Sequence, residues 1–239
     1  YPKLGAPLIK ELVNIAHLEK KDDNFINISS KYLSLFKVSV NDIILVNYMI
    51  YKHFNAHGKY AKKALAKIKS LGKNSSVSGE ALRYVAEFSF ANLENDFQQQ
   101  IDMKLLGGTV TALQTSIQAI FQNLVRLERS YAKVLSYREG YSGIKSFYYL
   151  GEAYRNYEKK LTNPPDITGA SNVELKKQLK GSADQVKAKA LSYYNKASDS
   201  CNKNNIYSVY CVRANTAISE LTGKGVGLEE WIVDTDIVA

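Results

Sequence analysis

The chain has 239 residues, of which 45% are hydrophobic and 23% are charged, and its formal net charge is +9. This apolar content can build a folded core, which excludes an intrinsically disordered chain. With four prolines and 14 glycines, the sequence lacks the turn residues that an all-β protein needs, so a few long helices are expected. No apolar run reaches the length of about 18 residues that a transmembrane helix requires. The positive charge suits an anionic partner, such as nucleic acid, a phospholipid surface or a cell-wall polymer, without choosing among them.

The first third of the chain predicts helices that pair as hairpins. Apolar residues recur at steps of three and four in residues 4–20 and again in residues 25–36. Ser39, with an acidic residue three positions later, resembles a capping box, and a very apolar helix follows it. Gly58 is expected to end that helix in a left-handed conformation. We therefore expect N-terminal helical hairpins over residues 1–74.

Residues 59–73 show the sharpest amphipathic pattern of the chain. One helical face is apolar, and the rest is mostly lysine, including Lys62, Lys63 and Lys67. This basic face is either the solvated outer surface of a hairpin or a docking surface for an anionic polymer or lipid headgroup. Lysines without interleaved aromatic residues attract phosphates but offer no platform for base stacking, so no nucleic acid is expected as a partner.

A second block of longer helices is predicted over residues 75–222. Residues 72–79, rich in glycine and serine, are the best linker candidate before it. One long helix should follow and end near Gly107. A further helix is expected over residues 113–134, where apolar residues keep steps of three and four. Ser142 is then expected to cap the next helix.

Proline and capping signals divide the rest of the chain. A helix over residues 143–161 must stop before Pro164 and Pro165, because proline cannot continue it. Two capping boxes, beginning at Ser171 and Ser182, predict a short helix before a long one. The remaining expected elements are a turn at residues 202–205, a helix over residues 207–221, and a C-terminal strap, strand or tail over residues 223–239.

Two stretches of this block resemble a tetratricopeptide repeat (TPR). The residues that match its first helix are Phe147, Leu150, Gly151 and Tyr154, and those that match its second helix are Ala190, Tyr194 and Ala197. The small residues let two helices approach closely, and the aromatic fills the gap between neighbouring hairpins. The resemblance implies an all-α fold, a right-handed α-solenoid of antiparallel helix pairs. The two stretches are thirty-six residues apart, where an ordinary repeat has about nine, so an insertion is expected inside the 143–202 repeat.

The order of helices over residues 79–221 also resembles the C-terminal TPR-like block of deltaproteobacterial envelope proteins, including components of gliding-motility complexes. The segments that carry this likeness are EALRYVAEFSFANL, LERSYAKVL, SFYYLGEAYRNYEKKLTNPP and KAKALSYYNKA. The resemblance implies a periplasmic or envelope-associated scaffold that is not an enzyme, needs no cofactor and holds other proteins of an envelope complex. The alternative is a binder of peptidoglycan or anionic lipid through the basic helix face.

Residue patterns for catalysis and metal binding are lacking. The sequence has neither a serine nucleophile elbow nor a phosphate-binding loop. His53 and His57 would share one helical face, as zinc ligands do, but no third ligand is apparent. We expect these two histidines to lie partly exposed in a fraying last turn, and His17 to be a hydrogen-bonded packing residue. No catalytic residue, metal or cofactor is therefore predicted.

Cys201 and Cys211 are the only cysteines, and they flank the predicted turn at residues 202–205. Side chains on the two sides of such a turn can come within disulfide reach. One interpretation is a disulfide that clips the hairpin, and the other is a pair of reduced cysteines packed as small apolar residues.

Seventeen tyrosines are present, and many of them crowd the later helices. Tyrosine is favoured both in packed helix interfaces and in protein-binding grooves, because one ring covers much apolar area at low entropic cost. Packing is the first interpretation. The second is a tyrosine-lined groove for a partner protein, for which the candidate residues are Tyr148, Tyr157, Tyr193 and Tyr207.

Overall fold

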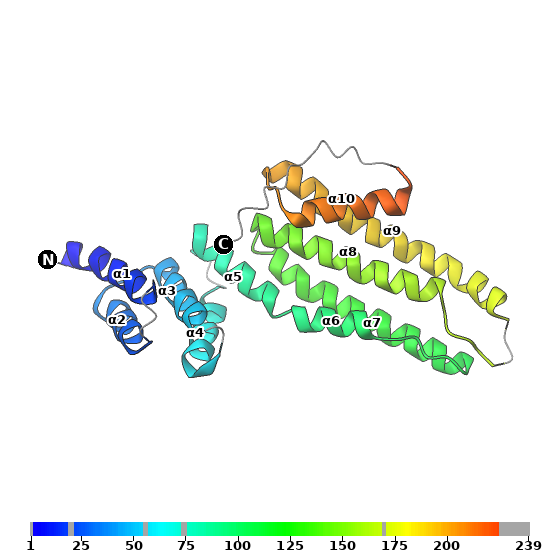
Figure 1. Ribbon diagram of the computed structural model, residues 1–239, viewed down its shortest axis with the longest axis horizontal. Coiled ribbons are helices and arrows are strands. Elements are labelled where there is room, and N and C mark those ends of the chain that lie inside the picture. The colour runs from blue at the N-terminus through cyan, green and yellow to red at the C-terminus, as the bar shows by residue number, and fades with distance from the viewer. Residues whose placement is uncertain (1, 19–21, 55–56, 73–75, 169–170, 225–239) are drawn as a thin grey trace. The chain divides into compact units, whose positions relative to one another are not determined.

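The computed structural model describes residues 2–18, 22–54, 57–72, 76–168 and 171–224. Within these ranges every regular element is a helix, apart from one isolated bridge between Gly108 and Ile167 (Figure 1). The predicted all-α class is confirmed. None of the described helices combines the length and the apolar character needed to cross a membrane.

The chain divides into two compact units, Tyr1–Ser89 and Phe90–Ala239. The sequence had suggested a boundary near residue 74, which lies inside the first of these units. Each unit has its own helix pairs and its own buried residues.

The N-terminal unit is built from short helices that pack in consecutive pairs. Its elements are α1 (Pro2–Leu18), α2 (Asp22–Leu35), α3 (Val40–His53), α4 (Gly58–Leu71) and most of α5 (Gly79–Ala91). Helix α1 packs on α2, and α3 packs on α4. Val13, Phe25 and Val46 are buried in one cluster of this unit.

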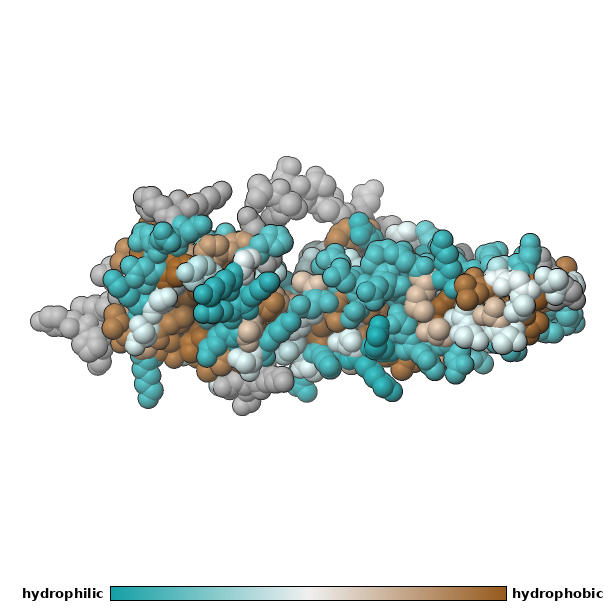
Figure 2. Space-filling view, turned by 90° about the horizontal axis from the view of Figure 1, so that it is seen from below, coloured by the Kyte–Doolittle hydropathy of each residue, from teal (hydrophilic) through white to brown (hydrophobic). Residues whose placement is uncertain are grey.

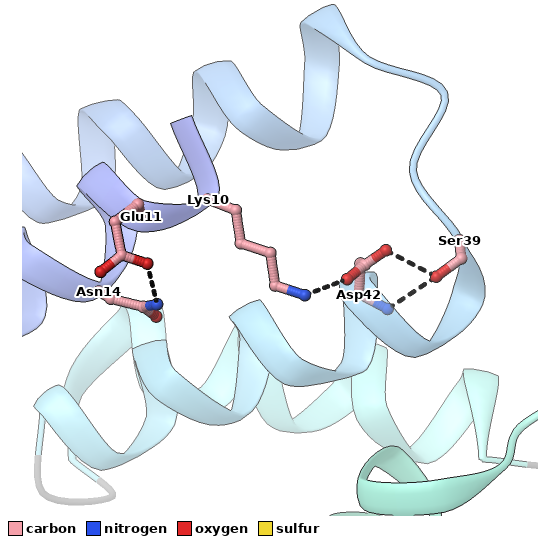
Figure 3. Close-up of polar contacts among 5 residues, drawn as sticks. All are labelled: Lys10, Glu11, Asn14, Ser39 and Asp42. Carbon is pink, nitrogen blue, oxygen red and sulfur yellow. Dashed lines mark hydrogen bonds and ion pairs between the residues drawn. The ribbon is translucent and has the colours of Figure 1, made fainter. Parts of the chain in front are cut away.

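Ser39 begins α3 as its N-cap, as expected: its hydroxyl accepts a hydrogen bond from the backbone N–H of Asp42 at 3.1 Å. The Ser39 hydroxyl also donates to the Asp42 carboxylate at 2.8 Å. That carboxylate accepts a second bond, at 2.7 Å, from Lys10 on α1, as Figure 3 shows. The hydrogen bond to Asp42 raises the pKa of Lys10. One acidic side chain thus joins the start of α3 to α1.

Gly58 does not end α3, contrary to the expectation. The helix ends earlier, at His53, and Gly58 is the first residue of α4. Its φ of +80° is in the left-handed region that glycine tolerates. The conformation was anticipated, but it starts a helix and does not terminate one.

The C-terminal unit is made of longer helices. They are α6 (Glu94–Asp102), α7 (Val110–Leu135), α8 (Gly140–Thr162), α9 (Asn172–Asn204) and α10 (Val209–Thr222). Helices α8 and α9 form the most extensive pair, α7 packs on α8, and α10 packs mainly on α9 (Figure 1). The apolar spacing predicted for α7 is confirmed, because Leu113, Ile120 and Leu127 are all buried.

The single long helix predicted between residue 80 and Gly107 is wrong. The chain turns at Leu93, whose N–H bonds to the carbonyl of Phe90, and α6 starts after it. Leu93 and Phe97 then pack against the core of the C-terminal unit, which a straight helix would not allow.

After α6 the backbone pairs with other segments of the C-terminal unit. Gly108 donates its N–H to the carbonyl of Asp166 at 2.9 Å and accepts from Thr168 at 3.0 Å. These bonds tie the connection between α6 and α7 to the connection between α8 and α9.

The short helix predicted inside the insertion is also wrong, because α9 runs without a break through Gly181 and Ser182. Gly181 is exposed, with no atom within 4 Å of a Cβ built on it, so an isolated glycine is tolerated there at small cost. On the neighbouring turns, Leu179 and Ala183 pack against the core. The wide spacing of the two TPR-like stretches therefore reflects two long helices and not an inserted element.

Two more expectations need correction or lie outside the structure. Helix α8 begins before Ser142, and its N-cap is Glu139, whose carboxylate accepts from the backbone N–H groups of Tyr141 and Ser142. Ser142 is buried inside the helix. Of the predicted C-terminal segment, only Gly223 and Lys224 are described, so the strap stays a prediction.

Candidate interaction surfaces

The residues that resemble a TPR meet across the α8–α9 pair. Leu150 and Tyr154 on α8 and Tyr194 on α9 are buried, and the ring of Phe147 stacks on that of Tyr193 with a centroid distance of 6.4 Å. Ala190 and Ala197 are buried on the same side of α9 and leave room for these rings. The Tyr194 ring lies directly against Gly151, where a side chain would collide with it. The signature positions are therefore packing positions.

Glu128 on α7 holds two of the tyrosines in place. Its carboxylate accepts a hydrogen bond from Tyr154 at 3.0 Å and another from Tyr193, and it forms an ion pair of 3.1 Å with Lys189. Burial opposes ionisation of this carboxyl, but the donors, led by Tyr193, outweigh it and lower the pKa of Glu128. Sequence patterns did not single out Glu128, since it lies far from Tyr193 and Lys189 along the chain.

The four tyrosines proposed for a groove do not line one surface. Tyr157 and Tyr193 are buried, and the Tyr157 hydroxyl donates to the carbonyl of Ile117 at 3.3 Å. Tyr207, just before α10, is 69% exposed, and Tyr148 on α8 is half-buried. Only Tyr148 belongs to a group of partly exposed rings.

That group is here called the Lys145 aromatic face, and its members are Tyr141, Lys145, Tyr148 and Tyr149 of α8 and Tyr210 of α10. Tyr141, Lys145 and Tyr148 recur at steps of four and three, and Tyr149 follows Tyr148, so the α8 members share one side of the helix. Tyr148 lies at the edge of this side that meets α9, because its ring centroid is 6.0 Å from that of Tyr194. Tyr141 is 42% exposed and the other members are half-buried.

Its centre is a cation held between aromatic rings. Lys145 Nζ lies 4.2 Å from the centroid of the buried Phe90 ring and 5.5 Å from that of Tyr210. The Tyr148 and Tyr210 rings are 5.6 Å apart, and burial raises the pKa of Tyr148 to about 12. The Tyr148 phenol is therefore neutral at physiological pH. The spacing of the tyrosines was visible in the sequence, but the role of Lys145 was not.

The basic face of α4 is present as predicted. Lys62, Lys63 and Lys67 are exposed, as are Lys59 and Lys69, while Ala61, Ala64 and Ile68 are buried on the opposite side. The amphipathic interpretation of this segment is confirmed.

The histidines form a different pair from the one considered in the sequence. His53 Nδ1 lies 3.3 Å from Nδ1 of His17, and His53 Nε2 lies 2.8 Å from Asp22 Oδ1. His57 is the N-cap of α4 and does not share a helix with His53. The description of His17 as a hydrogen-bonded packing residue is confirmed. Among the described residues, no group of histidine, cysteine and acidic side chains is arranged to hold a metal ion.

The cysteines are joined. Cys201 in the last turn of α9 and Cys211 in the first turn of α10 form a disulfide, with Cα atoms 6.1 Å apart. Between them Asn205 ends α9 in a left-handed conformation. The covalent link clips α9 to α10, as one of the two interpretations expected.

Other surface features are smaller. A half-open cavity of about 230 Å³ lies between α6 and α8, and its walls mix Arg155 and Lys159 with Glu152 and apolar side chains. On the face drawn in Figure 2, hydrophilic side chains cover much of the described surface and apolar ones show between them. Scattered exposed apolar residues of this kind are normal.

Comparisons with known proteins do not assign a family to this arrangement. No protein-family model matches the chain, and searches of curated proteins and of solved structures give no match either.

Proposed function

We propose that this protein is a non-enzymatic helical scaffold that binds other proteins of a bacterial envelope assembly through the Lys145 aromatic face. The observation that carries the proposal is a set of partly exposed tyrosines around a positioned lysine. Tyrosine is enriched in the energetic centres of protein interfaces, because its rigid ring buries a large area and its hydroxyl still bonds to the partner.

The framework beneath this face supports the same function. Gly151 and Tyr194 bring α8 and α9 into close contact, the hydroxyls of Tyr154 and Tyr193 bond to Glu128, and the disulfide joins α9 to α10. A surface that is already ordered loses less conformational entropy when a partner binds. Rigid display of this kind is what a scaffold requires.

The finer architecture that we propose is a TPR-like right-handed solenoid. It is supported by consecutive helices that pack on their neighbours and by the close small-residue contact between α8 and α9. Helix α1 also leaves Leu12, Ile15 and Leu18 exposed at the spacing of one helical side, as a helix that stacks on a further element would.

The proposed location is the periplasm or the cell envelope, with gliding motility as the first process to examine. The support is the resemblance of residues 79–221 to envelope scaffolds, together with a disulfide that suits an oxidising compartment.

The test is capture of envelope proteins by the immobilised chain, with washes at low and at high salt. The test variant is Tyr141→Ser combined with Lys145→Gln, and the matched control is Phe121→Ser, which removes an exposed ring of α7. We expect the wild type and the control to retain the same defined proteins in high salt, and the test variant to lose them. Equal retention by the test variant, with its helical content unchanged, would rule out this face as the binding site.

A further inference from the structure

The positive charge of the protein is concentrated in one short region. Residues 43–79 contain seven lysines and no aspartate or glutamate. Since the whole chain carries +9, the other residues together carry +2. Helix α4 supplies five of these lysines and has no acidic residue of its own.

The fold turns these five lysines outward on one side of α4. At about 100° per residue, Lys59, Lys62, Lys63, Lys67 and Lys69 spread over about 160° of the helix circumference. All five are exposed, whereas Ala61 and Ile68 on the opposite side are buried. The lysines span ten residues, or about 15 Å along the axis at 1.5 Å per residue. They form a compact strip, here called the α4 lysine strip.

Four of the five lysines of the strip have no charge partner among the described residues. The ion pairs described in the N-terminal unit join Lys10 to Asp42 and His53 to Asp22. The ammonium groups of Lys59, Lys62, Lys63 and Lys67 take part in none of the ion pairs or hydrogen bonds found among the described residues. The ammonium group of Lys69 lies 6.0 Å from the Phe88 ring centroid. The charges of Lys59, Lys62, Lys63 and Lys67 are therefore available to an external anion.

We propose that the α4 lysine strip binds the surface of a membrane that contains anionic phospholipids. Such a surface presents many phosphates in one plane, and lysine stems are long and flexible enough to reach several of them from one helix. Each lysine near an anionic bilayer adds to the affinity, so a dense strip on an exposed helix is matched to this partner by charge.

The structure favours lipid over nucleic acid. Nucleic-acid sites combine cations with aromatic rings on which bases stack. Tyr60 is the aromatic residue of α4, and its ring is already in contact with Phe54, at a centroid distance of 5.4 Å. The strip also lacks arginine, whose planar guanidinium group forms paired hydrogen bonds with the phosphates and bases of nucleic acids.

The apolar side of α4 faces the protein, so the helix cannot sink into the acyl region as an amphipathic membrane helix does. Binding is therefore peripheral, reversible and sensitive to salt, because it depends on charge alone. This inference goes beyond the scaffold function, since it uses another unit of the chain and another class of partner.

The experiment is sedimentation of the full chain with vesicles. One set consists of phosphatidylcholine containing about 30% phosphatidylglycerol, and the other of phosphatidylcholine alone. We expect binding to the anionic vesicles in low salt, loss of that binding in high salt, and none to the neutral vesicles. Vesicle binding uses no protein partner, so its failure leaves the scaffold function standing.

The variant pair that locates the site is Lys62→Gln with Lys63→Gln against Lys176→Gln with Lys177→Gln. Both pairs are adjacent exposed lysines in a helix, and each double variant removes the same charge. We expect the α4 variant to lose about fivefold in partition coefficient per lysine, or about 25-fold, and the α9 variant to lose much less. Equal losses would overturn the assignment to α4. Tighter retention on single-stranded DNA or on purified peptidoglycan than on the anionic vesicles would overturn the assignment to lipid.

Discussion

Gly151 on α8 lies against the ring of Tyr194 on α9, and a Cβ built on Gly151 would lie 2.6 Å from Cε1 of that ring. The ring has little freedom to move, because Tyr194 is fully buried and its hydroxyl donates to Glu152 at 2.6 Å. The two helices can approach this closely because residue 151 has no side chain. This contact is also the centre of the TPR-like signature.

Gly151→Ala is therefore expected to destabilise the C-terminal unit. Overpacking a buried contact costs about 1–3 kcal/mol, which exceeds the gain of up to about 1 kcal/mol that alanine brings to a helix interior. Urea unfolding followed by far-UV circular dichroism measures the change.

The matched control is Gly181→Ala in the middle of α9. A Cβ there would meet nothing within 4 Å, so only the helix propensity changes, and stability should rise by up to about 1 kcal/mol. If both variants stabilise the protein equally, the close contact between Gly151 and Tyr194 does not exist in solution.

Glu128→Gln is expected to weaken the junction of α7, α8 and α9. The substitution replaces charge-assisted bonds from Tyr154, Tyr193 and Lys189 by weaker ones, so we expect a loss of about 1–3 kcal/mol at neutral pH. Unfolding in urea at neutral pH measures this loss.

The same carboxyl should make stability depend on pH. Because its folded-state pKa lies below the ordinary value of 4.5, the folded protein binds fewer protons than the unfolded chain in that range. The contribution of Glu128 is therefore complete above the ordinary value and is lost as the pH falls through the folded-state pKa. Glu128→Gln should reduce this acid dependence, and Glu174→Gln, at an exposed position of α9, should not. An unchanged acid dependence in Glu128→Gln would contradict this account.

The sequence predicted the helices whose apolar residues recur over many turns. In α7 and α4 the expected apolar side is the buried side, because burial of one stripe is what stabilises an amphipathic helix. Breaks were harder to predict. The turn at Leu93 carries no glycine or proline and exists because Leu93 and Phe97 pack on the core, whereas Gly181 resembled a break and is none.

The candidate surfaces could be predicted only in part. The exposed lysines of α4 follow from local spacing alone. Whether a tyrosine is buried depends on residues that are distant in the sequence. Tyr193 can be buried because its hydroxyl donates a hydrogen bond to Glu128, sixty-five residues away. Burial of a polar ring requires such a partner, and a single sequence does not show which residues will meet.

Removal of the disulfide is expected to destabilise the α9–α10 hairpin. The Cys201–Cys211 bond closes a loop of ten residues, and the loss of loop-closure restraint in the unfolded chain corresponds to about 2–3 kcal/mol. Cys201→Ser with Cys211→Ser should therefore unfold at lower urea concentration than the oxidised wild type. The wild type treated with reductant should match the double variant. Intact mass under non-reducing conditions checks the bond, and two free thiols in protein from an oxidising compartment would contradict it.

The contact between His17 and His53 predicts that the N-terminal unit loses stability in mild acid. Burial, with a further contribution from the neighbouring His53, lowers the pKa of His17 below 6.5, so the unfolded chain takes up this proton at higher pH than the folded protein. Stability is therefore complete above about 6.5 and falls as the pH drops below that value, because a proton on His17 places a cation beside the second imidazole. Hydrogen exchange measured by mass spectrometry in peptides of α1 to α3 should show faster exchange, after correction for the intrinsic rate, at pH about 5 than at pH about 7.5.

His17→Gln should reduce this difference, while His57→Gln, at the exposed N-cap of α4, should preserve it. Equal pH dependence in both variants would show that the histidine pair does not control the stability of this unit.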